Sequence, residues 1–392
     1  MTIHFYALLA ALTAPALAQN VNTTYITGLD NALNDMGLTA LVSVVNMVAN
    51  DTNGGTVLIS QLSQGNKTVF APTNEALGGV LQNTSNNAGF LVPHTSYHIV
   101  DGHYNVSDFA QQPNHTVIRT YLTNSSLVHL EGGKGQVLVI ERDGGGGDNA
   151  HILPANGSIN IERTSTYENL IIHVINRAFA PPGNISETAM NRETNLSAVA
   201  GALQTANLLA SLEAAQGITI FAPTNQAFNE ALAALGSQAQ NVSVVSAILA
   251  NHIINGTSVY STGLTSQSFA SAGGQPYTFS TNSSGTYVTS GSSSARITRA
   301  DIPIRNGVIH LIENVLANNA SNPEVAASAA ASQSSVAATA TSVPGATNAG
   351  GPSPSPSNNA SVRTAGALPS AAAFISIVAT GLGALLGGMI VL

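Results

Sequence analysis

The feature that most constrains this 392-residue chain is an internal repeat. Three short blocks occur twice and in the same order: TVFAPTNEAL at 68–77 and TIFAPTNQAF at 219–228, YHIV at 97–100 and NHII at 251–254, NLIIHVI at 169–175 and NGVIHLI at 306–312. Blocks repeated so far apart indicate duplication of a whole domain, because solenoid units are much shorter. The chain is therefore predicted to fold twice into the same core.

Each first block predicts a short strand that ends at a proline and is followed by the start of a helix. Residues 68–70 are apolar and β-prone, Pro72 ends the run, and Thr73 or Asn74 can cap the helix that follows. An amphipathic helix is predicted before each block from apolar residues at helical spacing: Leu38, Leu41, Val42, Val45 and Val48, then Leu196, Val199, Leu203, Leu209 and Leu212. Both third blocks predict buried strands, so the fold class expected is α+β.

The three blocks resemble the fasciclin domain, an adhesion module of surface proteins. The first and third blocks are similar to that family's opening and closing motifs, and Tyr97-His98 is similar to its central Tyr-His pair. The resemblance implies two tandem fasciclin-like domains, at 20–183 and 184–320, each a β-wedge of about seven strands with surrounding α-helices. The second copy departs from the family by having Asn251 in place of the tyrosine.

The resemblance makes Tyr97, His98 and His252 candidate partner-binding residues. The alternative is that the two histidines lie on apolar helical faces and belong to the core. His173 and His310 alternate with aliphatic residues on predicted strands, which favours a core position for both. We expect no cofactor, no metal site and no catalytic residue, because the sequence has no cysteine, no His-Glu-x-x-His and no Gly-x-Ser-x-Gly motif.

The N-terminal end predicts a signal peptide over residues 1–18. An apolar run at 5–12 is followed by Ala-Leu-Ala at 16–18, so cleavage is expected before Gln19. The alternative is a buried N-terminal helix.

The C-terminal end predicts the signal for a glycosylphosphatidylinositol (GPI) anchor over 362–392. Small residues, a polar spacer and an uncharged apolar stretch at 371–392 follow one another, as such signals require. Asn359 is the expected attachment site because two small residues follow it, and Asn358 is the second choice. The alternative is a single transmembrane helix.

Between the second copy and this tail, residues 321–361 are rich in Ala, Ser, Thr, Pro and Gly. Such a composition offers little apolar surface to bury, so a disordered, O-glycosylated stalk is expected. Candidate N-glycosylation sites, from Asn-x-Ser/Thr triplets, are Asn22, Asn50, Asn66, Asn83, Asn105, Asn114, Asn124, Asn156, Asn184, Asn195, Asn241, Asn255, Asn282 and Asn319.

Composition narrows the function. Only 8% of residues are charged and the chain has two lysines, Lys67 and Lys134, so a nucleic-acid partner is not expected. The first hypothesis is a cell-surface adhesion or wall-organising glycoprotein that binds surface or matrix proteins, with glycans and self-association as further options. It would be extracellular, lipid-anchored to the plasma membrane or transferred to the wall. The alternatives are a structural wall glycoprotein without a specific ligand and, third, a carbohydrate-active enzyme.

Overall fold

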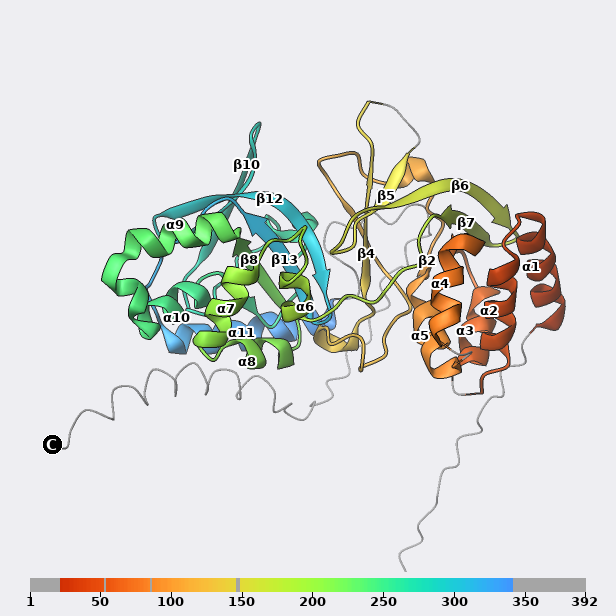
Figure 1. The fold of residues 1–392 in the computed structure, drawn as a ribbon, viewed down its shortest axis with the longest axis horizontal. Coiled ribbons are helices and arrows are strands. Elements are labelled where there is room, and N and C mark those ends of the chain that lie inside the picture. The colour runs from red at the N-terminus through yellow and green to blue at the C-terminus, as the bar shows by residue number, and fades with distance from the viewer. Residues whose placement is uncertain (1–21, 53, 85–86, 146–148, 341–392) are drawn as a thin grey trace, which may run out of the picture.

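The computed structural model describes residues 22–340 apart from 53, 85–86 and 146–148, and it contains two α+β domains side by side along its long axis (Figure 1). The predicted signal peptide, the anchor signal with Asn358 and Asn359, and residues 341–361 of the predicted stalk lie outside the described residues. The first domain has a seven-stranded sheet in the order β2-β1-β7-β6-β5-β4-β3, and the second a six-stranded sheet in the order β10-β11-β12-β13-β8-β9. The predicted α+β fold with a repeated core is confirmed.

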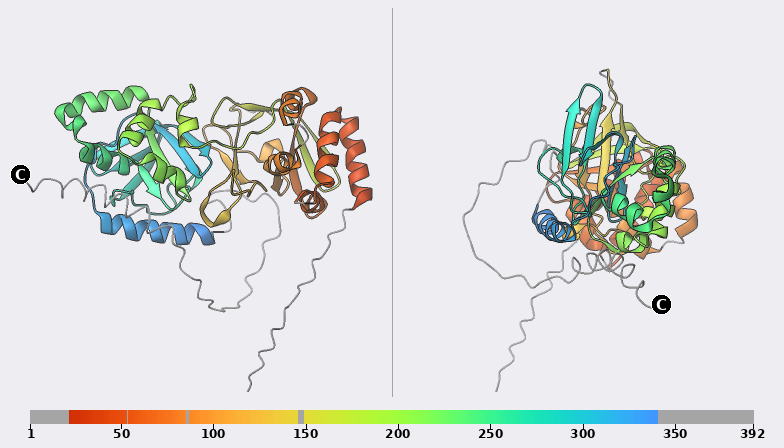
Figure 2. Two further views of the ribbon diagram at one scale, coloured as in Figure 1. Left: turned by 60° about the horizontal axis from the view of Figure 1, so that its bottom comes forward. Right: turned by 90° about the vertical axis from the view of Figure 1, so that its left-hand side faces the viewer.

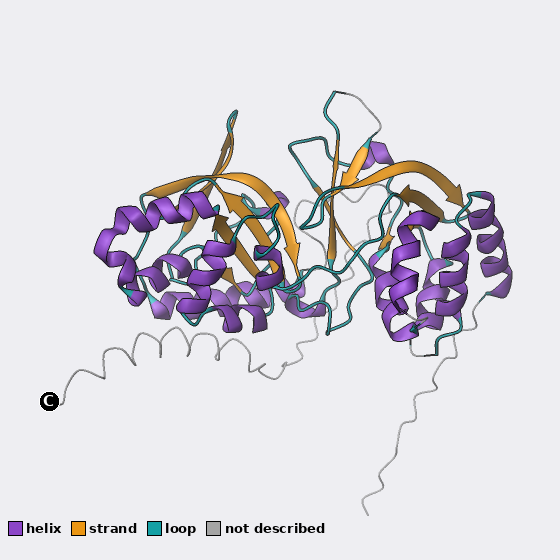
Figure 3. Ribbon diagram, in the orientation of Figure 1, coloured by secondary structure: helices purple, strands orange, loops and turns teal. Residues whose placement is uncertain are grey.

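The bounds of the elements show where the two copies correspond. The first domain contains α1 (Thr23–Asp35), α2 (Thr39–Ala49), α3 (Gly55–Leu62), β1 (Lys67–Pro72), α4 (Asn74–Thr84), α5 (Ala88–Tyr97), β2 (Ile99–Asp101), η1 (Val106–Asp108), β3 (Thr116–Arg119), η2 (Glu131–Gly133), β4 (Val137–Arg142), β5 (Ala150–Ile152), β6 (Ile159–Tyr167) and β7 (Leu170–Ile175). The second contains α6 (Ile185–Ala189), α7 (Ser197–Thr205), α8 (Leu209–Ala214), β8 (Ile218–Pro223), α9 (Asn225–Leu235), η3 (Gly236–Gln240), α10 (Val242–Ala250), β9 (Ile253–Asn255), η4 (Ser261–Gly263), β10 (Tyr277–Asn282), β11 (Gly285–Ser290), β12 (Ser293–Ile304) and β13 (Gly307–Ile312). Figure 3 shows helices α1–α5 gathered at the outer end of the first domain.

The first and third blocks meet as neighbouring parallel strands in both domains. Phe70 of β1 lies opposite His173 of β7, and Phe221 of β8 lies opposite His310 of β13. Leu170, Ile172 and Val174 of β7 point into a core shared with the helices, whereas Ile175 belongs to a second core. Burial on both faces explains why these strands are apolar almost throughout.

The residues after each proline cap two different helices. Thr73 accepts a hydrogen bond from the third amide of its own helix at 3.2 Å, as predicted. Asn74 instead caps α2, because its side-chain oxygen accepts the N–H of Ala40 at 2.9 Å. Thr224 and Asn225 repeat both roles in the second domain. This Thr-Asn pair therefore fixes the corner between strand and helices in both copies.

The prediction of a disordered stalk over 321–361 is wrong for its first part. Residues Pro323–Thr339 form a helix, α11, with Pro at its first position and an N-cap at Asn322 that accepts the N–H of Val325 at 3.1 Å. Alanine has the highest helix propensity, and its small side chain lets a helix lie close against another surface. Ala330 and Ala337 are buried in this way. None of the helices in the described ranges is long and apolar enough to cross a bilayer.

The two domains share a packed interface. A small apolar cluster joins Val117, Val137 and Val139 of the first domain to Tyr260 and Val308 of the second. Beside it, the fully buried amide of Gln136 donates to the carbonyl of Ile304 at 3.0 Å, so a polar group that would be costly to bury is satisfied across the interface.

A buried carboxylate anchors the other side of the interface. The Nδ1 atom of His115 in the first domain lies 2.7 Å from a carboxylate oxygen of Asp301 in the second, and the amide of Ser261 donates to the other oxygen at 2.6 Å. Burial by itself raises the pKa of Asp301, but the hydrogen bonds from His115 and Ser261 outweigh it and lower that pKa. The carboxylate therefore stays ionised although it is buried.

Replacing this carboxylate should weaken the domain pair. We expect Asp301→Asn to lower the free energy of unfolding by about 1.5–3 kcal/mol, the usual net contribution of hydrogen bonds to a charged group. Urea denaturation at neutral pH measures it.

Asp143→Asn is the matched control, since Asp143 also pairs with a histidine, His151, at 2.9 Å. Side-chain exposure is 37% for Asp143 and 0% for Asp301, so the control should cost at most about 1 kcal/mol. Equal losses in the two variants would contradict the structural role of Asp301.

Candidate functional site

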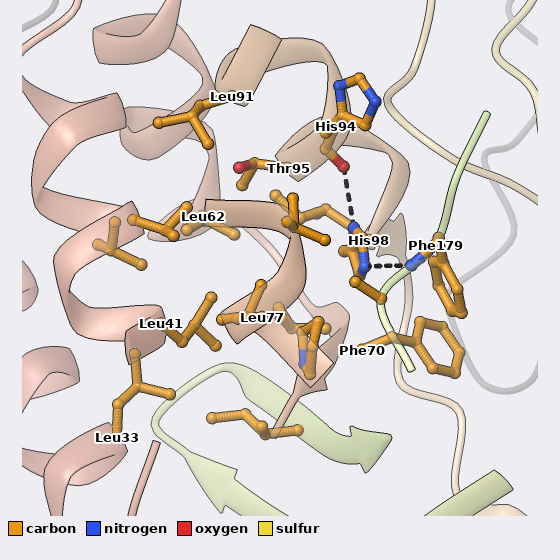
Figure 4. A pocket seen from close by; sticks show the side chains of 18 of the residues that line it. Leu33, Leu41, Leu62, Phe70, Leu77, Leu91, His94, Thr95, His98 and Phe179 are labelled. Atoms are coloured by element: carbon orange, nitrogen blue, oxygen red, sulfur yellow. Dashed lines mark hydrogen bonds between the residues drawn. The ribbon is translucent and has the colours of Figure 1, made fainter. Parts of the chain in front are cut away.

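His98, the second residue of the predicted Tyr-His pair, lies at the end of α5 and is buried. Its Nδ1–H donates to the carbonyl of His94 at 2.8 Å, and its Nε2 accepts the N–H of Phe179 at 2.9 Å (Figure 4). The ring also stacks on Phe179, with 4.4 Å between ring centroids. One donor and one acceptor partner define a neutral imidazole that ties the helix to the chain after β7.

His252 occupies the same place in the second domain. It is buried, donates to the carbonyl of Ile248 at 2.8 Å and accepts the N–H of Leu316 at 2.9 Å. Burial lowers the pKa of His98 to about 4 and that of His252 to about 4, because desolvation disfavours the charged ring. The described contacts thus favour the core interpretation of both histidines over direct contact with a partner.

Tyr97 is also buried, and it points to the domain interface. Its hydroxyl donates to the carbonyl of Val137 at 3.1 Å, and its ring packs edge-on against Phe179 at 5.6 Å. Val137 belongs to the apolar cluster between the domains. Tyr97 therefore connects the core of the first domain to the surface that carries the second.

Asn251, which replaces this tyrosine in the second domain, has a different role that sequence analysis did not predict. Its side-chain amide donates to the carbonyls of Asn318 and Ala320 at 2.9 and 2.8 Å, and its oxygen accepts the hydroxyl of Ser271 at 2.6 Å. It is completely buried. The substitution thus ties down the segment that leads into α11, through partners distant in sequence.

His173 and His310 are core histidines, as predicted. His173 contacts the hydroxyl of Thr164 and the carbonyl of Tyr104, each at 2.8 Å, and His310 contacts the N–H of Asp301 and the carbonyl of Val259. Both rings are fully buried. Burial lowers the pKa of each ring, so both are neutral links within the core.

Next to His98 the first domain contains an apolar pocket between helices and sheet (Figure 4). Its volume is about 80 Å³, and aliphatic and phenylalanine side chains such as Leu33, Leu77 and Phe70 line it. An apolar cavity of this kind stays dry and suits only a small apolar group. His94, Thr95 and His98 are the polar side chains in its lining, and a lining that is otherwise apolar does not suit a sugar or a charged ligand.

The polar groups around this pocket do not form a catalytic arrangement. Both ring nitrogens of His98 already have main-chain partners, and the Nδ1 of His94 contacts the carbonyl of Phe90 at 2.7 Å. Within the described ranges no group of three or more His, Asp or Glu side chains is placed to hold a metal ion. These side chains contribute to the packing of the core of the first domain.

Comparison with known proteins now identifies the domains. The profile of the Fasciclin domain matches residues 16–181 and 194–318, which together cover most of the chain. The chain belongs to the fasciclin family. That family is not a family of enzymes, and its two matches coincide with the two domains of the structure.

Two relatives illustrate the similarity. A curated fasciclin-like arabinogalactan protein from Arthroderma benhamiae is 29% identical over 244 residues, which is 60% of this chain and 53% of that protein, so the chain spans about half its length. The solved FAS1 domain pair from the insect cell adhesion molecule fasciclin I is 16% identical with a TM-score of 0.35, covering 72% of this chain and 97% of that one. Similarity at this TM-score carries no argument about how the domains are arranged.

Most predicted glycosylation sites of the two fasciclin domains lie at the surface. Exposed examples are Asn66 and Asn114 in the first domain and Asn282 in the second. Asn255 is the exception, because it lies in β9, which pairs with β8, and only 8% of its surface is exposed. A glycan there has no room in the folded protein, so the structure argues against that site. The side chain of Asn83 lies outside the described set.

The buried rings of His98 and His252 predict how the free energy of unfolding depends on pH. In the unfolded chain each ring takes up a proton near pH 6.5, whereas in the folded protein it does so only near pH 4. The stabilisation is therefore complete above pH 6.5 and is lost as the pH falls toward 4, by about 3 kcal/mol for each histidine.

Urea denaturation at pH 7 and pH 4.5 tests this, with His98→Gln/His252→Gln as the comparison. Glutamine cannot be protonated, so the double variant should lose less stability between the two pH values than the wild type. Equal losses would show that protonation of His98 and His252 does not contribute to the acid sensitivity.

Proposed function

We propose that this protein is an extracellular glycoprotein that attaches cells to a surface partner, or organises the wall, through its paired fasciclin domains. The observation that carries the proposal is that two fasciclin domains pack as one unit through a shared interface. The similarity to a fasciclin-like arabinogalactan protein supports the same class. Exposed glycosylation triplets on both domains fit a chain that is exported.

The partner-binding surface is proposed to lie away from the buried Tyr97-His98 pair. An open groove of about 620 Å³ crosses the first domain between α3, α5 and the turn after β3. Gln61, Asp101, Arg119 and Tyr121 line it, so it offers a carboxylate, a guanidinium and an aromatic ring at the surface. Tyr121 is held in place because its hydroxyl donates to Asp101 at 2.6 Å. A polar partner, such as a glycosylated protein, fits this lining better than it fits the apolar pocket.

Displaying the full chain on cells tests the adhesion proposal. Cells carrying the chain should attach to one another or to a coated surface, and cells carrying only 321–392 should not. Tyr121→Ala should reduce attachment. Tyr287 is a half-buried tyrosine on β11 of the other domain, and Tyr287→Ala should leave attachment unchanged.

Because only 8% of residues are charged, attachment should change little between low and physiological salt.

Two outcomes would contradict parts of this proposal. Attachment carried equally well by 321–392 would favour the second hypothesis, a structural wall glycoprotein without a specific ligand. Attachment that is intact in Tyr121→Ala but lost in Tyr287→Ala would move the binding surface from the groove to the second domain.

The lipid anchor is a separate part of the proposal. A phosphatidylinositol-specific phospholipase should release the displayed chain from cells. Mass spectrometry should show that the last residue of the released chain is Asn359, or Asn358 as the second choice. A chain that stays on the membrane after the phospholipase and keeps 371–392 would instead support the transmembrane helix.

A further inference from the structure

Helix α11 leaves the second domain and runs along the molecule to the first (Figure 2). It contacts β9 of the second domain and η2 of the first. A helix that only led away from the second domain would have no reason to contact the first. The contacts along its length therefore decide what it does.

The first half of α11 is fitted closely against the second domain. A Cβ atom added to Gly274 would lie 2.2 Å from the carbonyl oxygen of Asn322, and one on Gly256 would lie 2.6 Å from the carbonyl oxygen of Ala330. Both glycines have positive φ, so no other residue fits there without strain. The side chain of Gln333 then accepts the N–H of Ala270 and donates to the carbonyl of Asn255, at 3.0 and 2.8 Å.

The last turn of α11 is fitted in the same way against the first domain. A Cβ atom on Gly132 would lie 2.9 Å from the Cα of Ala338. The ammonium of Lys134, one of only two lysines, donates to the carbonyl of Ala337. A cation at the C-terminal end of a helix is favoured by the helix dipole. Ala337 itself is buried, so this end is docked through both packing and charge.

Beneath the helix lies the polar side of the domain interface. A cavity of about 270 Å³ is bounded by Arg119 and Glu131 of the first domain, Tyr260 of the second, and Gln333 and Ala337 of α11. Glu131 accepts the hydroxyl of Ser258 across the interface at 2.9 Å. Because the cavity is not filled by side chains, packing between the domains is incomplete here, and α11 closes the gap from outside.

We propose that α11 is a clamp that fixes the angle between the two fasciclin domains. Its start and middle are held on the second domain through Asn322, Ala330 and Gln333, and its last turn is held on the first domain through Ala337 and Ala338. Loss of the contact at the last turn would remove this link between the domains while the helix stays on the second domain. The clamp acts in addition to the direct contacts between the domains. The clamp does not rest on the proposed adhesion function.

The absence of cysteine makes the test direct, because two introduced cysteines can be spin-labelled without background. In the full chain we would label Asn31→Cys on α1 and Gln204→Cys on α7, both exposed, and measure the distance between the domains by double electron–electron resonance. Ala337→Glu places a charge at the buried contact with the first domain. Ala331→Glu places the same charge on an exposed position of the same helix and is the control.

The clamp predicts one narrow distance distribution for the unmodified chain and for Ala331→Glu, and a broad distribution shifted to other distances for Ala337→Glu. If the distance distribution of Ala337→Glu is as narrow as that of the control while its near-ultraviolet circular dichroism is native, the proposal is wrong. If Ala337→Glu loses its native circular dichroism, Lys134→Met is measured in its place. Lys134→Met should also broaden the distribution, and an unchanged narrow one would overturn the proposal equally.

Discussion

Parallel pairing of two strands that are far apart in sequence is the constraint on which each domain depends. β1 pairs with β7 and β8 pairs with β13, and all the other strands and helices are arranged around these central pairs. Parallel strands cannot be joined by a tight turn, so α4, α5 and β2–β6 lie in the connection from β1 to β7. In the second domain α9, α10 and β9–β12 lie in the connection from β8 to β13. Both faces of the pair are then covered, which is why Phe70 and Phe221 end up fully buried.

Buried histidines connect these central strands to their surroundings. His98 and His252 join a helix end to the segment after the last strand, and His173 and His310 join the last strand to a loop. A neutral imidazole suits this task because it has one donor and one acceptor on a flat, partly apolar ring. A chain without disulfides gains long-range links in this way, and they hold only while the rings stay uncharged.

The two domains pack against each other and are not joined by the connecting chain alone. Their interface combines an apolar cluster, a buried amide and a buried carboxylate, and the helix after the second domain returns to touch the first. Tyr97 and Asn251 show how the copies have diverged for this purpose. The tyrosine reaches the interface through Val137, whereas the asparagine holds the start of the segment that leads to α11.

The sequence by itself determined the duplication, the α+β class, the strand–proline–helix corner and the buried nature of the third blocks. These follow from local patterns, since a proline that ends a strand, a threonine N-cap and an apolar strand act within a few residues. Only the tertiary structure decided that Tyr97, His98 and His252 are buried, that Asn255 has no room for a glycan, and that Pro323–Thr339 is a helix. Those outcomes depend on partners distant in sequence, such as Val137 for Tyr97 and Gly132 for Ala338, and composition alone does not reveal which surface a segment will find.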